Sequence, residues 1–115
     1  MLITVFKSKI HRVRVTETEL NYIGSITIDK ALMDAAGIVE GEKVQICNIN
    51  NGERTETYAI SGEHGSGQIC VNGPGARRAE RGDILIIIAY GIVELDKAKD
   101  VQPKLVFPDE NNQIS

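Results

Sequence analysis

The chain has 115 residues, of which 42% are hydrophobic, and this is enough for one ordinary domain around a single core. Its formal net charge of -3 and pI near 5.4 give no broad positive field, which excludes nucleic acid as an expected partner. The longest apolar run, residues 84–90, is far shorter than the roughly 20 residues of a membrane-spanning helix, so we expect no membrane partner.

The first residues and the cysteines indicate the compartment. The mostly apolar residues Met1 to Phe6 precede the first lysine, whereas a secretory signal puts its basic residues first. Cys47 and Cys70 lie in separate strand-like segments, without C-x-x-C spacing or a nearby pair of histidines. We therefore expect a cytoplasmic protein with buried free thiols and no metal site.

The first predicted elements are two strands. Apolar and polar residues alternate over 12–15 and again over 26–29, which is the period-two pattern of half-buried strands. Residues 16–21 between them are polar and predict a turn. The bond between Gly24 and Ser25 therefore falls near the start of the second strand.

A short helix and a hairpin are predicted next. Asp29 is a typical N-cap, and Gly37 supplies the residue without a Cβ that often ends a helix. The apolar residues of 44–46 indicate a strand, 50–52 a tight turn, and 55–60 the returning strand.

The following segment alternates loops and short elements. Residues 62–67 predict a loop, 69–71 a short strand, and 73–75 a sharp turn before a brief helix over 76–81. The apolar residues 84–90 predict the most deeply buried strand.

The last part of the chain predicts little regular structure. A short apolar patch, residues 105–107, follows Pro103. The polar residues 111–113 after it predict a frayed end.

An internal repeat indicates how the strands are arranged. Residues 40–46 resemble residues 81–86, and in both a glycine and an acidic residue precede an apolar strand. This pattern is similar to the repeated turn of double-psi β-barrels, in which closure removes exposed strand edges. We therefore expect a mainly β fold, a double-psi β-barrel with short helices, as a single domain over residues 1–115.

The candidate for chemistry is the Gly24–Ser25 bond. A glycine carbonyl followed by a serine hydroxyl is sterically open to attack, and glycine tolerates the unusual dihedral angles that such attack needs. By itself this pair is most simply a turn followed by a solvated serine. More residues must match before it indicates a function.

Several stretches do match a known family, in order and with similar spacing. They are Lys9–Arg12, Leu20–Asp29, Asn50–Arg54 with Thr57–Tyr58, and Asn72–Gly73 with Ala76–Arg77. Together they resemble the aspartate 1-decarboxylase family, pyruvoyl-dependent enzymes that make β-alanine for pantothenate and hence coenzyme A. The resemblance runs from about residue 7 to residue 110.

The resemblance implies a self-made cofactor. In that family the Ser25 hydroxyl attacks the Gly24 carbonyl to give an ester, and elimination then cuts the chain into a β fragment, residues 1–24, and an α fragment, residues 25–115. Loss of ammonia leaves a pyruvoyl group at residue 25, so neither pyridoxal phosphate nor a metal is expected. The ketone condenses with the amine of L-aspartate and takes up the electrons released when carbon dioxide leaves.

The resemblance also implies roles for individual side chains. Arg54 would fork onto the substrate carboxylate and Lys9 would add positive charge. Tyr58 would return a proton after decarboxylation, and Thr57 would assist cleavage and then contact substrate. Without the resemblance, Lys9 and Arg54 are solvated strand residues. Tyr58 is then a core tyrosine, and Thr57 is an ordinary strand threonine. Adjacent residues on a strand point to opposite faces, so a bulge or a twist would be needed to bring Thr57 and Tyr58 to one site.

The segment after Asn72 departs from the family pattern. Asn72 matches a residue near the pyruvoyl group, and Gly73, Pro74 and Gly75 match a backbone segment that binds substrate carboxylate. Many family members have alanines where this chain has Pro74 and Gly75. Proline has no backbone N–H, so residue 74 cannot bind an anion through its nitrogen.

The resemblance further implies a homotetramer with sites between subunits, and in some relatives an activating partner for cleavage. Two alternatives remain open. One is a non-catalytic double-psi barrel that serves as a binding module. The other is a self-processing serine protein that stops at the ester or hydrolyses it, leaving no pyruvoyl group.

Overall fold

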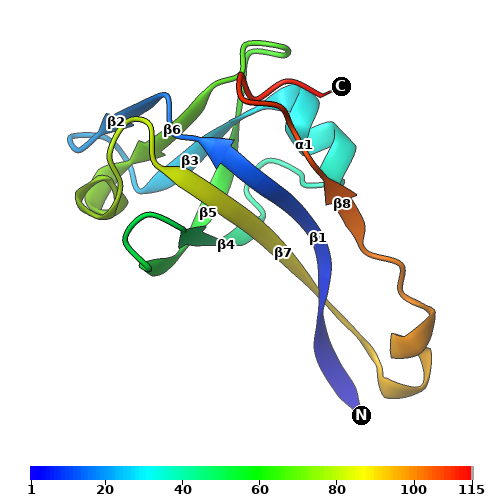
Figure 1. Cartoon of the computed structure of the whole chain (residues 1–115). Helices are drawn as coiled ribbons and strands as arrows, with labels where there is room; N and C mark the ends of the chain where they lie inside the picture. Colours follow the sequence, from blue (N-terminus) through cyan, green and yellow to red (C-terminus); the bar gives the residue numbers. More distant parts are fainter. Residues whose placement is uncertain (115) are drawn as a thin grey trace.

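The structure is a computed structural model that describes residues 1–114 (Figure 1). The strands are β1 Leu2–Arg14, β2 Glu17–Glu19, β3 Ser25–Asp29, β4 Lys43–Asn48, β5 Arg54–Gly62, β6 Ile69–Asn72, β7 Ile84–Glu94 and β8 Lys104–Val106. The helices are α1 Lys30–Ala36 and two 3-10 helices, η1 Gly73–Arg78 and η2 Leu95–Asp100. In this part of the chain no helix is long and apolar enough to cross a membrane.

The strands form one sheet in the order β2-β6-β3-β5-β4-β7-β1-β8. Its longest pairing is the antiparallel ribbon of β1 and β7, which extends from Leu2 opposite Glu94 to Arg14 opposite Ile84. Figure 1 shows this ribbon running the length of the molecule and projecting beyond the rest of the sheet at its outer end. β3 pairs in parallel with β5 and antiparallel with β6, which places the start of β3 inside the strongly curved part of the sheet.

The core consists of aliphatic side chains from both halves of the chain, as expected for a composition with few aromatic residues. Fully buried members include Ile10, Ile26, Ile28, Leu32, Ile69, Leu85 and Ile87. They come from β1, β3, α1, β6 and β7, so the core joins strands that are distant in sequence. Burial of such side chains is the main favourable contribution to folding.

The predicted helix between Asp29 and Gly37 is confirmed. The Asp29 carboxylate accepts a hydrogen bond from the Ala31 N–H at 2.8 Å, as an N-cap does, and Gly37 ends the helix with φ of 69°. The same buried carboxylate accepts hydrogen bonds from the N–H groups of Gly65 and Gly67, at 2.8 Å each. The cap therefore also fixes the loop between β5 and β6.

The internal repeat is visible in the backbone. Gly41 and Gly82 have positive φ angles of 85° and 92°. Gly41 donates its N–H to the carbonyl of buried Ala59 in β5, and Gly82 donates its N–H to the carbonyl of buried Val15 just after β1, both at 2.8 Å. Each glycine thus precedes one of two neighbouring strands, β4 and β7, in the same way.

Two expectations about local structure were wrong at the ends of elements. Residues 16–21, predicted as a turn, contain the short strand β2, which pairs in parallel with β6. The helix predicted over 76–81 begins at Gly73 and ends at Arg78. Pro74 explains the earlier start, because its fixed φ suits the first turn of a helix.

Two expectations about burial were also wrong. β7 alternates between buried and half-buried residues up to Ala89, whereas all four residues of β6 are buried, so β6 is the more deeply buried strand. Cys70 is buried as predicted, but Cys47 is only partly so, and both are free thiols.

The chain end predicted to fray is held in place. Asn112 is 2% exposed, and its side chain donates to the carbonyls of Arg14 and Gly67 and accepts from the Arg14 N–H, at 2.8 Å each. These bonds attach the last described residues to the end of β1 and to the loop before β6.

Candidate active site

The Gly24–Ser25 bond enters the buried part of the sheet. Ser25 is the first residue of β3 and lies opposite Asn72 at the end of β6. Its side chain is 1% exposed, and Oγ donates a hydrogen bond to the Ile23 carbonyl at 3.0 Å. Oγ also accepts one from Asn72 Nδ2 at 3.0 Å. A solvated serine after a turn, the simplest interpretation of the dipeptide, does not describe this residue.

The Asn72 amide connects several groups of the site. It is 4% exposed, and Nδ2 donates to Thr27 Oγ1 as well as to Ser25 Oγ, at 3.0 Å each. At its other end, Oδ1 accepts from the Cys70 thiol at 3.1 Å. The amide is thus hydrogen-bonded at both ends and holds the Ser25 hydroxyl in one place.

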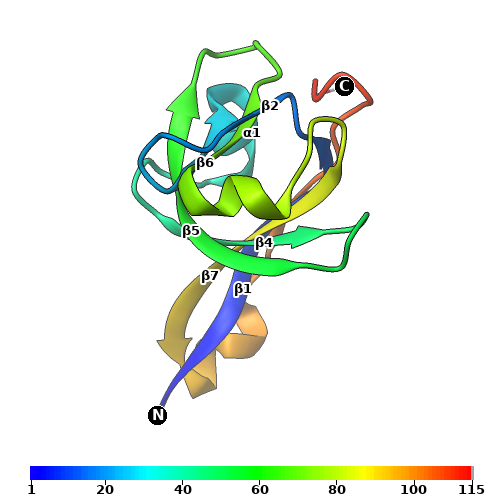
Figure 2. The same cartoon turned by 90° about the vertical axis from the view of Figure 1, so that its left-hand side faces the viewer.

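Gly73 packs against the backbone of Gly24. Its φ of 71° favours glycine, and a Cβ at this position would lie 2.7 Å from Gly24 Cα and 2.9 Å from the Tyr22 carbonyl oxygen. Pro74 follows in the first turn of η1, where its Cδ would lie 3.7 Å from a Cβ on Gly24. Figure 2 shows η1 as the yellow-green coil beside β5 and β6. The start of η1 therefore covers the bond that the sequence marks for cleavage.

A hollow of about 460 Å³ opens beside this bond, and we call it the Ser25 hollow. Its lining residues are Gly24, Ser25, Ile46, Arg54, Thr55, Glu56, Thr57, Val71, Asn72, Pro74, Gly75 and Arg78. Most of the predicted site residues therefore lie around one cavity, although they come from β3, β5, β6 and η1. Its volume is within the range of small-molecule sites.

Thr57 and Tyr58 lie on opposite faces of β5. The register of β5 against β4 is continuous from Arg54 to Tyr58, so this segment contains no bulge. Thr57 lines the Ser25 hollow, whereas Tyr58 is opposite Lys43 and is 38% exposed on the other face. The Tyr58 hydroxyl is thus outside the hollow of its own chain.

Lys9 is also outside the Ser25 hollow. It lies on β1 opposite Ile88 of β7, and Nζ is 5.5 Å from the centre of the Phe6 ring. Nearby His11 packs its ring edge-to-face on Phe107. One chain thus collects Arg54, Thr57 and the Asn72–Gly75 segment at the Gly24–Ser25 bond but leaves Lys9 and Tyr58 elsewhere.

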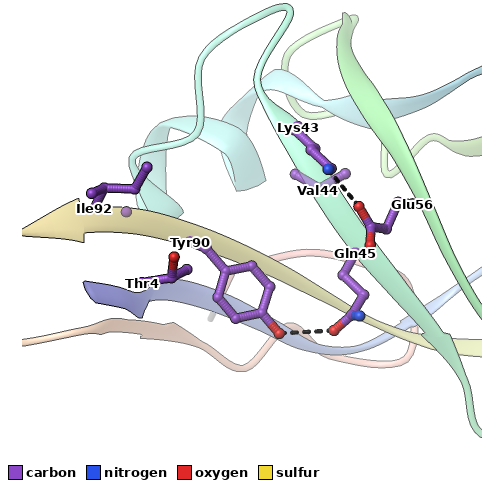
Figure 3. A pocket seen from close by; sticks show the side chains of 8 residues that line it. Thr4, Lys43, Val44, Gln45, Glu56, Tyr90 and Ile92 are labelled. Atoms are coloured by element: carbon purple, nitrogen blue, oxygen red, sulfur yellow. Dashed lines mark hydrogen bonds and ion pairs between the residues drawn. The ribbon is translucent and has the colours of Figure 1, made fainter. Parts of the chain in front are cut away.

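A second hollow of about 460 Å³, the outer hollow, lies over β4, β7 and β1 (Figure 3). Its lining residues are Thr4, Lys43, Val44, Gln45, Glu56, Tyr90, Gly91 and Ile92. Tyr90 donates its hydroxyl to Gln45 Oε1 at 2.8 Å, and Lys43 pairs with Glu56 at 2.6 Å. None of the predicted site residues lines it.

Sequence reasoning missed two charged residues of the Ser25 hollow, Glu56 and Arg78. Arg78 ends η1 and pairs with Glu53. Arg54 donates from Nη1 to Gln45 Oε1 at 3.1 Å and lines the same hollow. The only feature of the sequence that indicates Arg78 is the pair Arg77–Arg78 after the turn predicted at 73–75. The pair by itself does not show which of the two side chains faces the hollow.

Comparison with solved structures defines the class of fold. The computationally designed msDPBB_sym2 protein matches 76% of this chain and 99% of its own, with a TM-score of 0.53 and 16% identity. The rationally designed mkDPBB_sym_86 protein matches 67% of this chain and 90% of its own, with a TM-score of 0.51 and 14% identity. The protein is therefore a double-psi β-barrel, as expected, with a Gly-Ser bond at a buried serine beside a hollow.

Comparison of sequences then identifies the family. The family model described as aspartate decarboxylase matches residues 1–115. Aspartate 1-decarboxylase of Cytophaga hutchinsonii is 60% identical over 99% of both chains, and that of Christiangramia forsetii is 62% identical over 99% of this chain and 98% of its own. The chain belongs to the aspartate decarboxylase family, which confirms the resemblance inferred from the motifs.

Proposed function

We propose that this chain is the precursor of a cytoplasmic enzyme that converts L-aspartate to β-alanine and carbon dioxide, after it cuts its own backbone between Gly24 and Ser25. The products of the cut are the β fragment, residues 1–24, and the α fragment, residues 25–115. The observation that carries the proposal is the Ser25 hydroxyl, which is buried and held by two hydrogen bonds next to the Gly24 carbonyl. Family membership and the adjoining hollow support it.

The cut follows from the position of Ser25. Its Oγ forms a bond to the Gly24 carbonyl carbon, the peptide C–N bond breaks, and an ester replaces the amide. Loss of the Ser25 α-proton then expels the ester oxygen as the new carboxylate of Gly24. Tautomerisation and addition of water release the nitrogen as ammonia and leave a ketone at residue 25. Thr57, which lines the hollow with Gly24, is proposed to hydrogen-bond the Gly24 carbonyl during attack.

The residues around Ser25 fit a pyruvoyl group. Ser25 sits at the wall of a hollow of about 460 Å³, so a group formed there would face a space large enough for a small amino acid. When present, the pyruvoyl ketone supplies the amine-condensing carbon and the electron sink for decarboxylation. Asn72 would then remain beside it as a side-chain donor.

The charges of the hollow suit a substrate with two carboxylates. Arg54 is proposed to bind the side-chain carboxylate with two parallel hydrogen bonds, and Arg78 adds a second guanidinium to the lining. Pro74 has no N–H, so we assign the backbone contacts of this segment to Gly75, with Gly73 shaping the turn.

A second chain would complete the site. Lys9 and Tyr58 do not line the Ser25 hollow of their own chain, although the resemblance gives them roles in catalysis. We propose a homotetramer with sites between subunits, in which a neighbouring chain supplies one or both residues. In that assembly Tyr58 would return the proton to the substrate carbon.

The product indicates the place of the enzyme in metabolism. β-Alanine is the amine component of pantothenate, and we propose that this chain supplies it for coenzyme A synthesis. Whether cleavage requires an activating partner is decided by the same experiment that tests the cut.

That experiment is the intact mass of the purified protein under denaturing conditions. We expect two fragments divided after Gly24, the larger one lighter by one ammonia than hydrolysis alone would give and labelled by a hydrazine. A larger fragment with an ordinary serine amine would contradict the pyruvoyl group. A single 12.6 kDa species that stays uncut after long incubation and after addition of cell extract would favour a non-catalytic binding module.

A further inference from the structure

The orientation of the Asn72 amide is not determined by the hydroxyls that it contacts. Nδ2 faces Ser25 Oγ and Thr27 Oγ1, at 3.0 Å each. A hydroxyl can donate or accept, and the two ends of an asparagine amide are nearly equal in size. An amide turned by 180° would accept from the same hydroxyls through Oδ1, and the Ser25 proton would then point to Asn72 instead of the Ile23 carbonyl.

The group at the other end of the amide removes this ambiguity. Cys70 Sγ lies 3.1 Å from Asn72 Oδ1, and Cys70 is 5% exposed. A thiol donates its S–H to a carbonyl, whereas its sulfur is a weak acceptor for an N–H. Burial, with the nearby charges of Glu17 and Glu19, raises the pKa of Cys70 to about 11, so the proton needed for donation is present at neutral pH.

We infer that Cys70 is a positioning residue for self-cleavage: by donating to Oδ1, its thiol keeps Asn72 Nδ2 directed at Ser25 Oγ. This inference rests on the proposed function and assigns it a residue that does not line the Ser25 hollow. With Nδ2 in this direction, the Ser25 proton is left to bond the Ile23 carbonyl, so the hydroxyl has one fixed arrangement.

The directed N–H has a chemical role in both steps of the cut. During attack Ser25 Oγ gives up its proton, and a donated N–H stabilises the negative charge that develops on the oxygen. During elimination the Cβ–Oγ bond breaks and the same oxygen becomes part of the Gly24 carboxylate, which the N–H also stabilises. A turned amide would instead present its oxygen to this charge, which is repulsive.

The test compares Cys70→Ser, Cys70→Ala and wild type, each purified rapidly and followed by the mass of its fragments over time. Serine keeps a donor, so we expect Cys70→Ser to cleave within about threefold of the wild-type rate. Alanine removes the donor, and the loss of one hydrogen bond predicts cleavage slower by about tenfold or more. Cys47→Ala, at a partly exposed cysteine on β4, is the matched control and should cleave at the wild-type rate.

The outcomes separate this inference from the proposed function. If wild type is never cut, the proposed function fails and the inference fails with it. If wild type is cut and Cys70→Ala is cut as fast, only the inference is overturned. Slow cleavage of Cys70→Ser with a wild-type thermal unfolding midpoint would also overturn it, because shape and not donation would then matter. This second comparison holds even if Cys70→Ala does not fold.

Discussion

Gly73 and Gly24 lie against each other although they are 49 positions apart in the sequence: a Cβ on Gly73 would lie 2.7 Å from Gly24 Cα and 2.8 Å from its nitrogen. The residue that opens η1 therefore supports the bond proposed for cleavage. No side chain fits between them without a shift of one backbone segment.

Gly73→Ala should slow cleavage strongly and destabilise the fold. Alanine would be strained at a φ of 71° and would also overlap Gly24. Gly52→Ala is a matched control, because Gly52 has a φ of 77° but open space around its Cβ position. Chemical unfolding should show both variants destabilised by about 1 kcal/mol or more. Fragment mass should show that only Gly73→Ala is impaired in cleavage. Equal cleavage of the two variants would contradict the contact.

Ser25→Ala should abolish the cut and all activity, because no hydroxyl remains to attack the Gly24 carbonyl. The purified variant should keep the mass of the uncut chain, 12.6 kDa less one oxygen. Ser66→Ala, at an exposed serine of the loop before β6, serves as the control and should mature normally. Efficient cutting of Ser25→Ala at the same bond would rule out the mechanism.

Tyr58→Phe should leave cleavage intact but reduce turnover of aspartate by about 10²-fold, because the proton donor is lost while the Ser25 hollow is unchanged. Tyr90→Phe is the matched control on the outer hollow: it removes the hydrogen bond to Gln45 Oε1 but leaves Gln45 free to accept from Arg54, so it should turn over normally. The measurement is β-alanine formed by the matured enzyme. Wild-type turnover by Tyr58→Phe would remove Tyr58 from catalysis.

Sites shared between chains predict complementation. Tyr58→Phe and Arg54→Ala should each be nearly inactive, yet their co-expression should restore activity, since mixed assemblies contain some sites with both native residues. For random assembly of equal amounts, roughly a quarter of the sites would be intact if the two residues come from different chains. No recovery in a proven mixed assembly would place both residues on one chain.

Stability should fall between pH 9 and about 11 because of Cys70. Burial raises the pKa of its thiol from 9.0 to about 11 in the folded chain. Below pH 9 the thiol is protonated in both the folded and the unfolded chain, so it does not change the free energy of unfolding. Above pH 9 the unfolded chain loses the proton first, which favours unfolding by up to about 2–3 kcal/mol. Urea unfolding of wild type and Cys70→Ser across this range isolates the effect. Parallel curves would contradict it.

Asn112→Ala should destabilise the protein by about 2–4 kcal/mol. The substitution removes three hydrogen bonds and leaves the part-buried backbone groups of Arg14 and the buried carbonyl of Gly67 without their partner. Asn111→Ala, next to it and exposed, should cost much less, and thermal unfolding measures both. Equal midpoints for the two variants would mean that the chain end does not stabilise the barrel.

The sequence by itself determined the features that depend on neighbouring residues. The Asp29–Gly37 helix and the hairpin at residues 50–52 follow from capping and turn chemistry, which act over a few residues. The repeated glycine turns predicted the class of fold, because Gly41 and Gly82 each precede a strand in one of two similar segments of the sequence. The Gly24–Ser25 motif and its companions identified the family for the same reason: their order and spacing are written in the chain.

Only the tertiary structure decided which side chains meet. β2 exists because it pairs with β6, residues far from it in sequence, and Asn112 is ordered by contacts with Arg14 and Gly67. Arg78 reaches the Ser25 hollow through the turn of η1, whereas Tyr58 lies on β5 opposite Lys43 and does not line it. These outcomes depend on pairings between distant strands, and local propensity carries no information about them because burial and register are set by the whole sheet.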